Sequence, residues 1–214
     1  MGGEQKLKEG DEIILSLETN NDRELLFFTD RMQCYKARVN DFADTKASVL
    51  GDYVPAKLNM EEGENTVFCA VTDASYRGYM LFFFQNGKLA KVNLSSYATK
   101  ANRKKLIKAY CDKFPLAAVM QLEEDCEIVV ETAAGRCLLF NTAIVTPKAM
   151  KDTQGVSCFS LKKNNVITKA RPFVKGEFVK PGRYRTRTLP SAGAVLSTED
   201  IALKTNLTLQ GFDE

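Results

Sequence analysis

Residues 79–97 read YMLFFFQNGKLAKVNLSSY, and this stretch decides the fold class that the sequence predicts. Its apolar run at residues 80–84 is rich in aromatic side chains and has no helical period, which favours a strand. Asn86-Gly87 is a strong turn pair, and residues 88–92 then resume an extended, alternating pattern. Together these features predict a β-hairpin.

The same pattern occurs twice more in the chain. Residues 24–42 read ELLFFTDRMQCYKARVNDF, and residues 127–145 read EIVVETAAGRCLLFNTAIV. The three turns fall at Met32, Gly87 and Gly135, so successive units are 55 and 48 residues apart. Because Met32 stands where the other two turns have glycine, we expect the first turn to use a different geometry.

Further strand-like stretches lie between the hairpins, at residues 53–56, 66–71, 106–110, 116–122, 157–161 and 166–170. Each repeat of about 50 residues then holds about four short strands, which is the content of one propeller blade. We therefore predict an all-β, propeller-like domain of about four four-stranded blades in an open or incomplete ring. The blades are placed at residues 12–64, 65–114, 115–164 and 165–200, with a tail at 201–214; a closing strand after Ser197 is the alternative.

The composition argues against catalysis by the chain itself. Histidine is absent from the 214 residues, which removes the commonest general base and every Ser-His or Cys-His pairing. Phosphate-binding, dinucleotide-binding and calcium-binding loop motifs are also absent, so we expect no cofactor in this chain. The acidic cluster at residues 123–127 is interpreted as a solvated turn rather than a metal site. The aromatic run at residues 82–84 is interpreted as core rather than a stacking platform.

The six cysteines lie mostly within apolar runs, such as residues 67–71, and none forms a C-x-x-C pair. We interpret them as buried reduced thiols of a cytosolic protein, with a disulfide framework or a zinc site as the alternative. The polar start MGGEQKLKEGDE predicts no signal peptide, and no apolar run approaches the roughly 20 residues of a membrane helix. We therefore expect a cytoplasmic protein with no membrane partner.

The net charge of +3 conceals an asymmetry along the chain. Residues 1–75 carry 8 Lys and Arg against 15 Asp and Glu, whereas residues 76–190 carry 21 against 8. A segment with this excess of basic residues predicts a polyanion as the partner, although solvated charged faces are common in any protein.

The repeats resemble the C-terminal domain of the A subunit of bacterial type IIA DNA topoisomerases, which comprise DNA gyrase and topoisomerase IV. ELLFFTDRMQCYKARVNDF and LFFFQNGKLAKVNLSSY are similar to the blade pattern of this family, as is DTQGVSCFSL at residues 152–161. The resemblance covers about residues 10–190 and implies a β-pinwheel, whose basic outer rim binds and bends double-stranded DNA.

The resemblance also implies the partners and the chemistry of a larger enzyme. An ATPase B subunit would be one protein partner, beside the remainder of the A subunit, with ATP and Mg²⁺ used elsewhere in the parent enzyme. The seven-residue box typical of gyrase is absent, which favours topoisomerase IV or a truncated domain. Arg183-Tyr184 places the residue types of the family's catalytic pair side by side, but in a blade-like context, so no catalytic residue is expected.

The candidate DNA-binding residues are the cations of loops that should align from blade to blade. The densest group lies in the second blade, and its members are Lys100, Arg103, Lys104, Lys105 and Lys108. Its counterparts are Lys46 in the first blade and Lys148 and Lys151 in the third. Such contacts go to phosphates and read no sequence. We expect DNA to avoid the acidic residues 1–30.

Further candidates lie on predicted strands. Lys88 and Lys91 are three positions apart on the second hairpin, so their side chains face opposite ways and only one is expected on the DNA surface. The last region contributes Lys169, Arg171, Arg183, Arg185 and Arg187. The final three alternate and are predicted to present their guanidinium groups on one sheet face.

Two other functions stay open at this stage. The first is a protein-interaction propeller with no role in DNA binding, in which the acidic first blade recruits a partner. The second is a regulatory module of an unrelated enzyme. Basic loops that recur at equivalent blade positions favour DNA, because a protein-binding propeller has no reason to repeat them.

Overall fold

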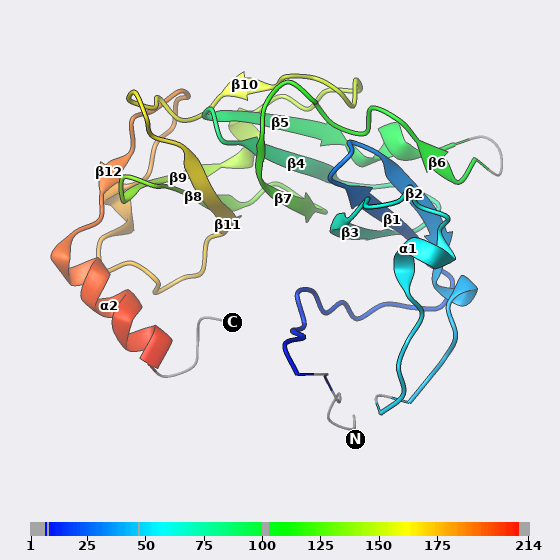
Figure 1. Ribbon diagram of the computed structural model, residues 1–214. Coiled ribbons are helices and arrows are strands. Elements are labelled where there is room, and N and C mark those ends of the chain that lie inside the picture. The colour runs from blue at the N-terminus through cyan, green and yellow to red at the C-terminus, as the bar shows by residue number, and fades with distance from the viewer. Residues whose placement is uncertain (1–6, 8, 47, 100–102, 210–214) are drawn as a thin grey trace. The chain divides into compact units, whose positions relative to one another are not determined.

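The computed structural model describes residues 7, 9–46, 48–99 and 103–209, with side chains described up to residue 204. These residues form three four-stranded antiparallel sheets with few helices (Figure 1), which confirms the predicted all-β fold class. The chain divides into two compact units. One is Met1–Arg77 with Tyr97–Ala109, and the other is Gly78–Ser96 with Tyr110–Glu214.

The first unit holds one sheet, with the strand order β3-β1-β2-β6. Its strands are β1 (Glu24–Thr29), β2 (Cys34–Arg38), β3 (Thr66–Thr72) and β6 (Lys105–Leu106). A 3-10 helix, η1 (Val39–Asp41), follows β2, and a short helix, α1 (Val54–Lys57), precedes β3. The prediction of a strand at residues 53–56 is wrong, because Pro55 in the first turn of α1 favours a helix start.

The second unit holds two sheets, ordered β10-β5-β4-β7 and β11-β8-β9-β12. Their strands are β4 (Tyr79–Phe84), β5 (Lys88–Asn93), β7 (Leu116–Leu122), β8 (Glu127–Thr132), β9 (Arg136–Asn141), β10 (Val156–Ser157), β11 (Ile167–Pro172) and β12 (Ala194–Val195). The 3-10 helices are η2 (Leu94–Tyr97), η3 (Thr142–Ile144) and η4 (Pro181–Arg183).

Each sheet is built on one of the predicted hairpins and flanked by two strands from later in the chain. β3, β7 and β11 pair with the first hairpin strand, and we call them the inner strands. β6, β10 and β12 pair with the second hairpin strand, and we call them the outer strands. β6 follows the β4–β5 hairpin in sequence yet pairs with β2, and β10 follows the β8–β9 hairpin yet pairs with β5. The chain therefore completes each of the first two sheets only after it has formed the next hairpin.

This exchange changes the interpretation of residues 165–200, which were expected to form a fourth blade. They contribute β11 and β12 to the third sheet instead. Their predicted turn at Pro181-Gly182 is part of the 3-10 helix η4.

The three hairpin turns share one geometry, so the expectation of a different first turn is wrong. Met32, Gly87 and Gly135 have φ angles of 53°, 88° and 67°, all in the left-handed region. Each donates its backbone N–H to the carbonyl three residues earlier, at 3.2, 3.1 and 2.9 Å. A type I turn followed by a left-handed residue has this arrangement. Met32 therefore adopts a conformation that costs a non-glycine residue about 1–2 kcal/mol.

The end of the chain forms a helix, α2 (Thr198–Leu209), where a closing strand or a tail was predicted. Ser197 caps it: its hydroxyl accepts the backbone N–H of Asp200 at 3.2 Å and donates to the Asp200 carboxylate at 2.6 Å. The Tyr184 hydroxyl donates to the same carboxylate, which ties the helix start to the third sheet's loop. The sequence Ser-x-x-Asp is a capping signature that could have predicted this helix.

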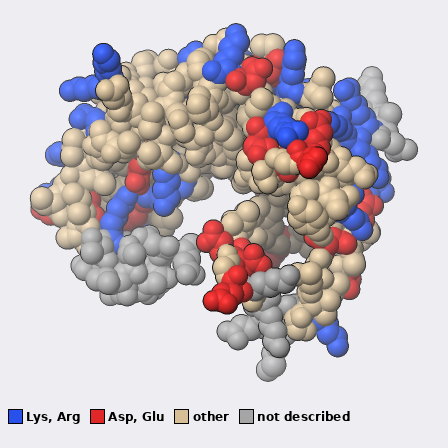
Figure 2. Space-filling view, viewed as in Figure 1, with Lys and Arg blue, Asp and Glu red and all other residues tan. Residues whose placement is uncertain are grey.

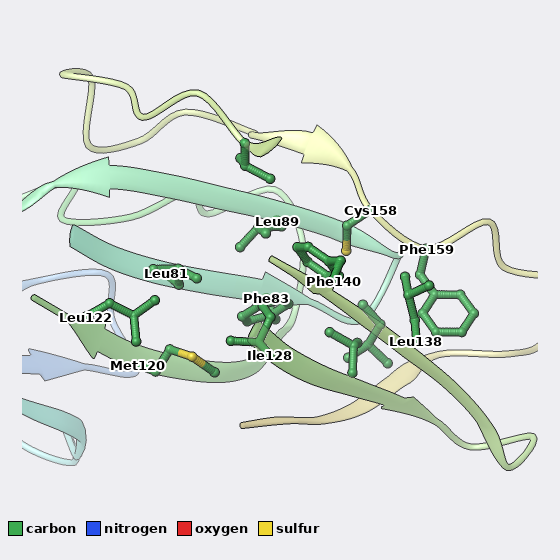
Figure 3. Packing of buried hydrophobic residues seen from close by; sticks show 13 residues of the cluster. Leu81, Phe83, Leu89, Met120, Leu122, Ile128, Leu138, Phe140, Cys158 and Phe159 are labelled. Carbon is green, nitrogen blue, oxygen red and sulfur yellow. The ribbon is translucent and has the colours of Figure 1, made fainter. Parts of the chain in front are cut away.

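The second and third sheets share a hydrophobic core within the second unit (Figure 3). Leu81 and Phe83 of β4 pack with Ile128 of β8 and with Leu138 and Phe140 of β9, and all five are 0% exposed. The aromatic run at residues 82–84 is fully buried, as expected. Side chains from both faces of β4 are thereby removed from water, which is the main favourable contribution to folding.

The six cysteines are free thiols, and none is paired in a disulfide. Cys34, Cys111, Cys137 and Cys158 are buried, whereas Cys69 and Cys126 are partly buried. Burial raises the pKa of Cys69, Cys137 and Cys158 to about 12. These three thiols therefore stay protonated and act as small apolar side chains.

We predict that Gly155→Ala destabilises the protein much more than Gly135→Ala. Both glycines have a left-handed φ, of 70° and 67°, so the backbone cost of about 1–2 kcal/mol is the same. A Cβ at residue 155 would lie 2.0 Å from the Leu89 carbonyl oxygen, whereas one at residue 135 meets nothing within 4 Å. The clash should add about 1–3 kcal/mol. Urea denaturation measures both variants, and equal losses would contradict the close approach of β10 to β5.

Candidate nucleic-acid interface

In the second unit, one basic residue lies beside the second strand of each hairpin. Lys148 forms a parallel bridge with Val92 of β5, and Arg185 forms one with Leu139 of β9. The Lys148 N–H donates to the Lys91 carbonyl at 2.8 Å. The backbone therefore fixes the position of both cations relative to their sheets.

The first unit also places a lysine beside its second hairpin strand, but through the antiparallel pairing of β2 with β6 rather than a parallel bridge. The Lys36 N–H of β2 donates to the Lys104 carbonyl at 2.8 Å. We call Lys104, Lys148 and Arg185 the bridge cations. The loops that carry Lys104 and Lys148 follow the 3-10 helices η2 and η3, and Lys46 lies in the loop after η1. All four residues are exposed.

Arg185 is exposed but also paired. Its guanidinium donates to both carboxylate oxygens of Glu127, at 2.6 and 3.0 Å. This pairing lowers the pKa of Glu127 and raises that of Arg185. Arg185 could still reach a phosphate, although it would then share its donors with Glu127.

Only some cations of the densest predicted group, Lys100 to Lys108, are exposed and free to contact a phosphate. Arg103 and Lys108 are exposed, and Lys100 lies outside the described residues. Lys105 belongs to β6 and is only half exposed, because its amine pairs with Glu61 at 2.8 Å and lies 5.4 Å from the Tyr35 ring centroid. Hydrogen bonding from Lys105 lowers the pKa of Glu61 to about 2. Lys105 therefore fastens the outer strand to its sheet.

A groove of about 280 Å³ lies in the first unit beside β2. Two exposed lysines, Lys57 and Lys104, line it together with Asp41 and Asn59. The groove could hold an anion next to the bridge cation Lys104. The negative charge of Asp41 would weaken the binding of that anion.

Other predicted cations in the second unit are partly engaged. Lys88 is half buried, donates to Gln154 Oε1 at 3.3 Å and lies 5.0 Å from the Phe114 ring centroid. Lys151 is partly buried, and Lys169 is exposed on the inner strand β11. Arg171 pairs with Glu131 at 3.3 Å and with Glu177, so it is a poor candidate for a phosphate contact.

The prediction that Lys91 contacts DNA conflicts with its position. Lys91 is 2% exposed, and its amine donates to Asp125 at 2.5 Å and to the Thr142 carbonyl at 3.1 Å. The amine also lies 4.2 Å from the ring centroid of Tyr79. A side chain with these partners stabilises the sheet and cannot reach a phosphate. The alternation argument correctly separated Lys88 from Lys91 but did not show which of them was buried.

Lys36 is the equivalent residue of the first hairpin, four positions after its turn, as Lys91 is of the second. It is 6% exposed and pairs with Glu24 at 3.2 Å. Its amine also donates to the Tyr97 carbonyl at 3.3 Å and to the Thr99 hydroxyl at 3.0 Å. Two of the three hairpins thus bury a paired lysine, and the third has Leu139 at this position.

The prediction that three alternating arginines share one sheet face is also wrong. Arg183 lies in η4, Arg185 forms an isolated bridge, and Arg187 lies in a bend, so they are not on one strand. All three are nevertheless exposed. Pro181 begins the 3-10 helix that interrupts the expected strand.

Two exposed cations that the sequence patterns did not single out, Lys162 and Lys163, lie in the turn between β10 and β11. The sequence Lys-Lys-Asn-Asn is a polar turn with two adjacent charges, which could have identified them. Figure 2 shows basic side chains distributed over the surface, with acidic side chains among them.

The acidic turn at residues 123–127 is partly structural, since Asp125 pairs with Lys91 and Glu127 with Arg185. Among the residues that the structure describes, no group of three or more Cys, Asp or Glu side chains could hold a metal ion. In the same part of the chain, no helix is long and apolar enough to cross a membrane.

We predict that Lys91→Ala lowers the free energy of unfolding by about 3 kcal/mol, because it leaves a cavity and an unpaired carboxylate. Lys88→Ala is the control, with an expected loss below about 1 kcal/mol because its contacts are weaker and more solvated. Urea denaturation measures both values. The folded Lys91→Ala protein should keep any affinity for an anionic partner, and a large loss there would show that Lys91 is accessible after all.

Asp125 should make stability depend on pH. Burial raises its pKa, but the hydrogen bonds from Lys91 and Thr142 outweigh burial, and the net pKa lies below the ordinary 3.8. The stabilisation is therefore complete above pH 4 and is lost as the pH falls through the pKa of the folded state. Asp125→Asn should lower the free energy of unfolding at neutral pH, with a difference from the native protein that shrinks below pH 4. Glu124→Gln is the exposed control, and a difference independent of pH would contradict the ion pair.

Comparison with known proteins gives one consistent result, although no family model matches the chain. The chain is 27% identical over 163 residues to the A subunit of DNA topoisomerase 4 from Staphylococcus aureus, and 26% identical to that of strain MRSA252. Each match covers 75% of this chain and 20% of the relative, so the chain spans about a fifth of the relatives' length.

Solved structures show the same likeness. The C-terminal domain of DNA topoisomerase IV matches with a TM-score of 0.69 and 22% identity, over 82% of this chain and 55% of that one. The C-terminal domain of DNA gyrase A matches with a TM-score of 0.61 and 16% identity, over 90% and 68%. The Escherichia coli ParC C-terminal domain gives 0.59 and 12%, over 78% and 68%. The chain therefore has the β-pinwheel fold of topoisomerase C-terminal domains, and A subunits of topoisomerase IV are among its relatives.

Proposed function

We propose that this chain is a non-catalytic DNA-binding domain of a type IIA topoisomerase A subunit, and that it holds duplex DNA by its phosphates. The observation that carries the proposal is that one exposed cation lies beside the second strand of each hairpin: Lys104 beside β2, Lys148 beside β5 and Arg185 beside β9. A repeated fold that presents a cation once per sheet matches a ligand with regularly repeated negative charge.

Further exposed cations lie in each of the two units. They are Lys46, Arg103, Lys108, Lys162, Lys163, Arg183 and Arg187. Apart from Arg183, which ends the 3-10 helix η4, they lie in loops and turns, where lysine and arginine can approach a backbone without entering a groove. This binding would position DNA without reading its sequence.

The proposal also includes bending of the duplex. Bending 20–30 base pairs by 40–90° costs about 1–6 kcal/mol, which the added phosphate contacts would have to offset. The domain would in this way determine which DNA segment is presented to the strand-passage enzyme.

The proposal extends to the partners of a parent enzyme. They would be the ATPase B subunit, with the sites for ATP and Mg²⁺ lying outside this domain, together with the rest of the A subunit. Topoisomerase IV is favoured over gyrase, because the relatives from Staphylococcus aureus belong to topoisomerase 4 and the chain lacks the gyrase box. A location in the bacterial cytoplasm, near the chromosome, follows from this function.

The test is a matched pair of double variants, each of which removes two positive charges. Arg103→Ala/Lys104→Ala removes exposed cations of the proposed surface, and Arg23→Ala/Arg31→Ala removes cations paired with Asp73 and Glu61. The affinity for a fluorescent duplex of about 40 base pairs is measured across a salt series, where each phosphate contact contributes about −0.9 to the log–log slope.

We expect the first variant to flatten the slope by about 1.8, which is two lost contacts, and the second to leave it unchanged. Equal effects of the two variants would mean that the affinity reflects net charge alone. Absence of duplex binding by the native chain at low salt would refute the proposal.

A further inference from the structure

The outer strand of the first sheet is attached differently from the other two. In every sheet the outer strand pairs with the residue two positions after the turn residue, through Leu106, Val156 or Ala194. The residue before this position is Gly155 in the second sheet and Gly193 in the third, where a Cβ would lie 2.0 and 2.5 Å from a carbonyl oxygen. The equivalent residue of the first sheet is Lys105, which has a Cβ and cannot repeat this close approach. The two-residue strand β6 therefore needs another attachment.

The side chain of Lys105 supplies that attachment. Its amine pairs with Glu61 at 2.8 Å and lies 5.4 Å from the ring centroid of Tyr35, its cross-strand neighbour. The Glu61 carboxylate also accepts hydrogen bonds from Arg31 at 3.0 Å and from Gln33 at 3.2 Å. One carboxylate thus joins the first hairpin to its outer strand.

A buried carboxylate fixes the position of Glu61. Glu64 is 2% exposed, and it accepts the Glu61 N–H at 3.1 Å and the Tyr35 hydroxyl at 2.8 Å. The Thr29 hydroxyl donates to the same carboxylate. An isolated exposed ion pair contributes less than about 1 kcal/mol. A partner that is already held in place loses less conformational entropy when the pair forms, so this pair stabilises more than an isolated one.

The strand held in this way positions two exposed cations of the proposed DNA surface. The Lys104 carbonyl accepts the Lys36 N–H at 2.8 Å, and the Arg103 Nε donates to the Lys105 carbonyl at 3.1 Å. Adjacent residues of an extended chain point to opposite faces, and Lys104 accordingly lines the groove beside β2 while Lys105 faces Glu61. Release of β6 from Glu61 would therefore move Arg103 and Lys104 with it.

We propose that Glu61 is a positioning residue for DNA binding, which fixes β6 through Lys105 and so holds Arg103 and Lys104 where they contact phosphates. An acidic residue then strengthens the binding of a polyanion, which is the opposite of its direct electrostatic effect. A masking role, in which Glu61 withholds Lys105 from DNA, has the opposite sign. The inference rests on the proposed function, which assigns Arg103 and Lys104 to DNA.

The test compares Glu61→Gln with Glu62→Gln, each of which removes one negative charge. Glu62 is the adjacent exposed residue, and its bond to Arg31 uses only its backbone carbonyl. The affinity for a duplex of about 40 base pairs is measured across a salt series. We expect Glu61→Gln to flatten the log–log slope by about 1, an average loss of one phosphate contact, and Glu62→Gln to leave it unchanged. An unchanged or steeper slope in Glu61→Gln, or equal flattening in both variants, would overturn the proposal.

A double-mutant cycle tests whether Glu61 acts through Lys105. Lys105→Met removes the amine and keeps the apolar stem of the side chain. The double variant Glu61→Gln/Lys105→Met should have the same slope as Lys105→Met, because residues that act through one shared contact are not additive. Additive losses would overturn the proposal, since Lys105 would then contact a phosphate on its own.

Hydrogen exchange without DNA reports the attachment of β6 directly. The Lys36 amide, which donates to Lys104, should exchange several-fold faster in Glu61→Gln than in Glu62→Gln, while the amides of β1 stay protected. Equal exchange of the Lys36 amide in the two variants would overturn the proposal. If the native chain bound no duplex, the proposed function would be refuted and the DNA role of Glu61 with it. The exchange rates would still show separately whether Glu61 holds β6.

Discussion

The exchange of the outer strand is the constraint on which the rest of the fold depends. The first two hairpins obtain their fourth strand from chain that has already passed through the next hairpin, and the third obtains β12 only after β11 has formed, so no repeat is finished by local sequence alone. The outer strands are only two residues long. Gly155 and Gly193, which precede β10 and β12, have left-handed φ angles and approach the backbone of β5 and β9 closely. Short outer strands also leave little free edge for aggregation. The same return of the chain places a cation beside each second strand, so the architecture and the proposed function share one cause.

Lysine serves two opposite purposes in these repeats. Lys36 and Lys91 are buried beneath their sheets and paired with carboxylates, whereas Lys104 and Lys148 are exposed on the loops that run beside the same strands. A buried lysine is costly unless its partners satisfy it, and the carboxylate, carbonyl and aromatic contacts of Lys91 do so. The third hairpin has Leu139 instead, packed with Phe178 and Tyr184, so this position requires a filled volume rather than a charge.

The hairpins were predictable from sequence because their signals are local: an apolar run, a turn residue and alternation. The inner strands were predictable too, at residues 66–71, 116–122 and 166–170. The outer strands β6 and β10 were predicted too long, since they are two-residue strands held by contacts with distant parts of the chain. The exposed loop cations were identifiable from charge, but Lys91 was not distinguishable from Lys88, because burial depends on which face of the sheet meets the core. Arg183 and Arg187 were misplaced because Pro181 begins a 3-10 helix. The helix α2 was missed although Ser197 and Asp200 form its capping signature.

The most direct test of the central claim, that the loops beside the second hairpin strands hold DNA, is lysine acetylation followed by mass spectrometry. Acetylation rates would be compared with and without a duplex of about 40 base pairs. Lys175 is an exposed control in the loop after β11, the strand at the opposite edge of the third sheet from β12. The account predicts that bound DNA slows acetylation of Lys104 and Lys148 several-fold and leaves Lys175 unchanged. Equal slowing at Lys175, or none at Lys104 and Lys148, would contradict it.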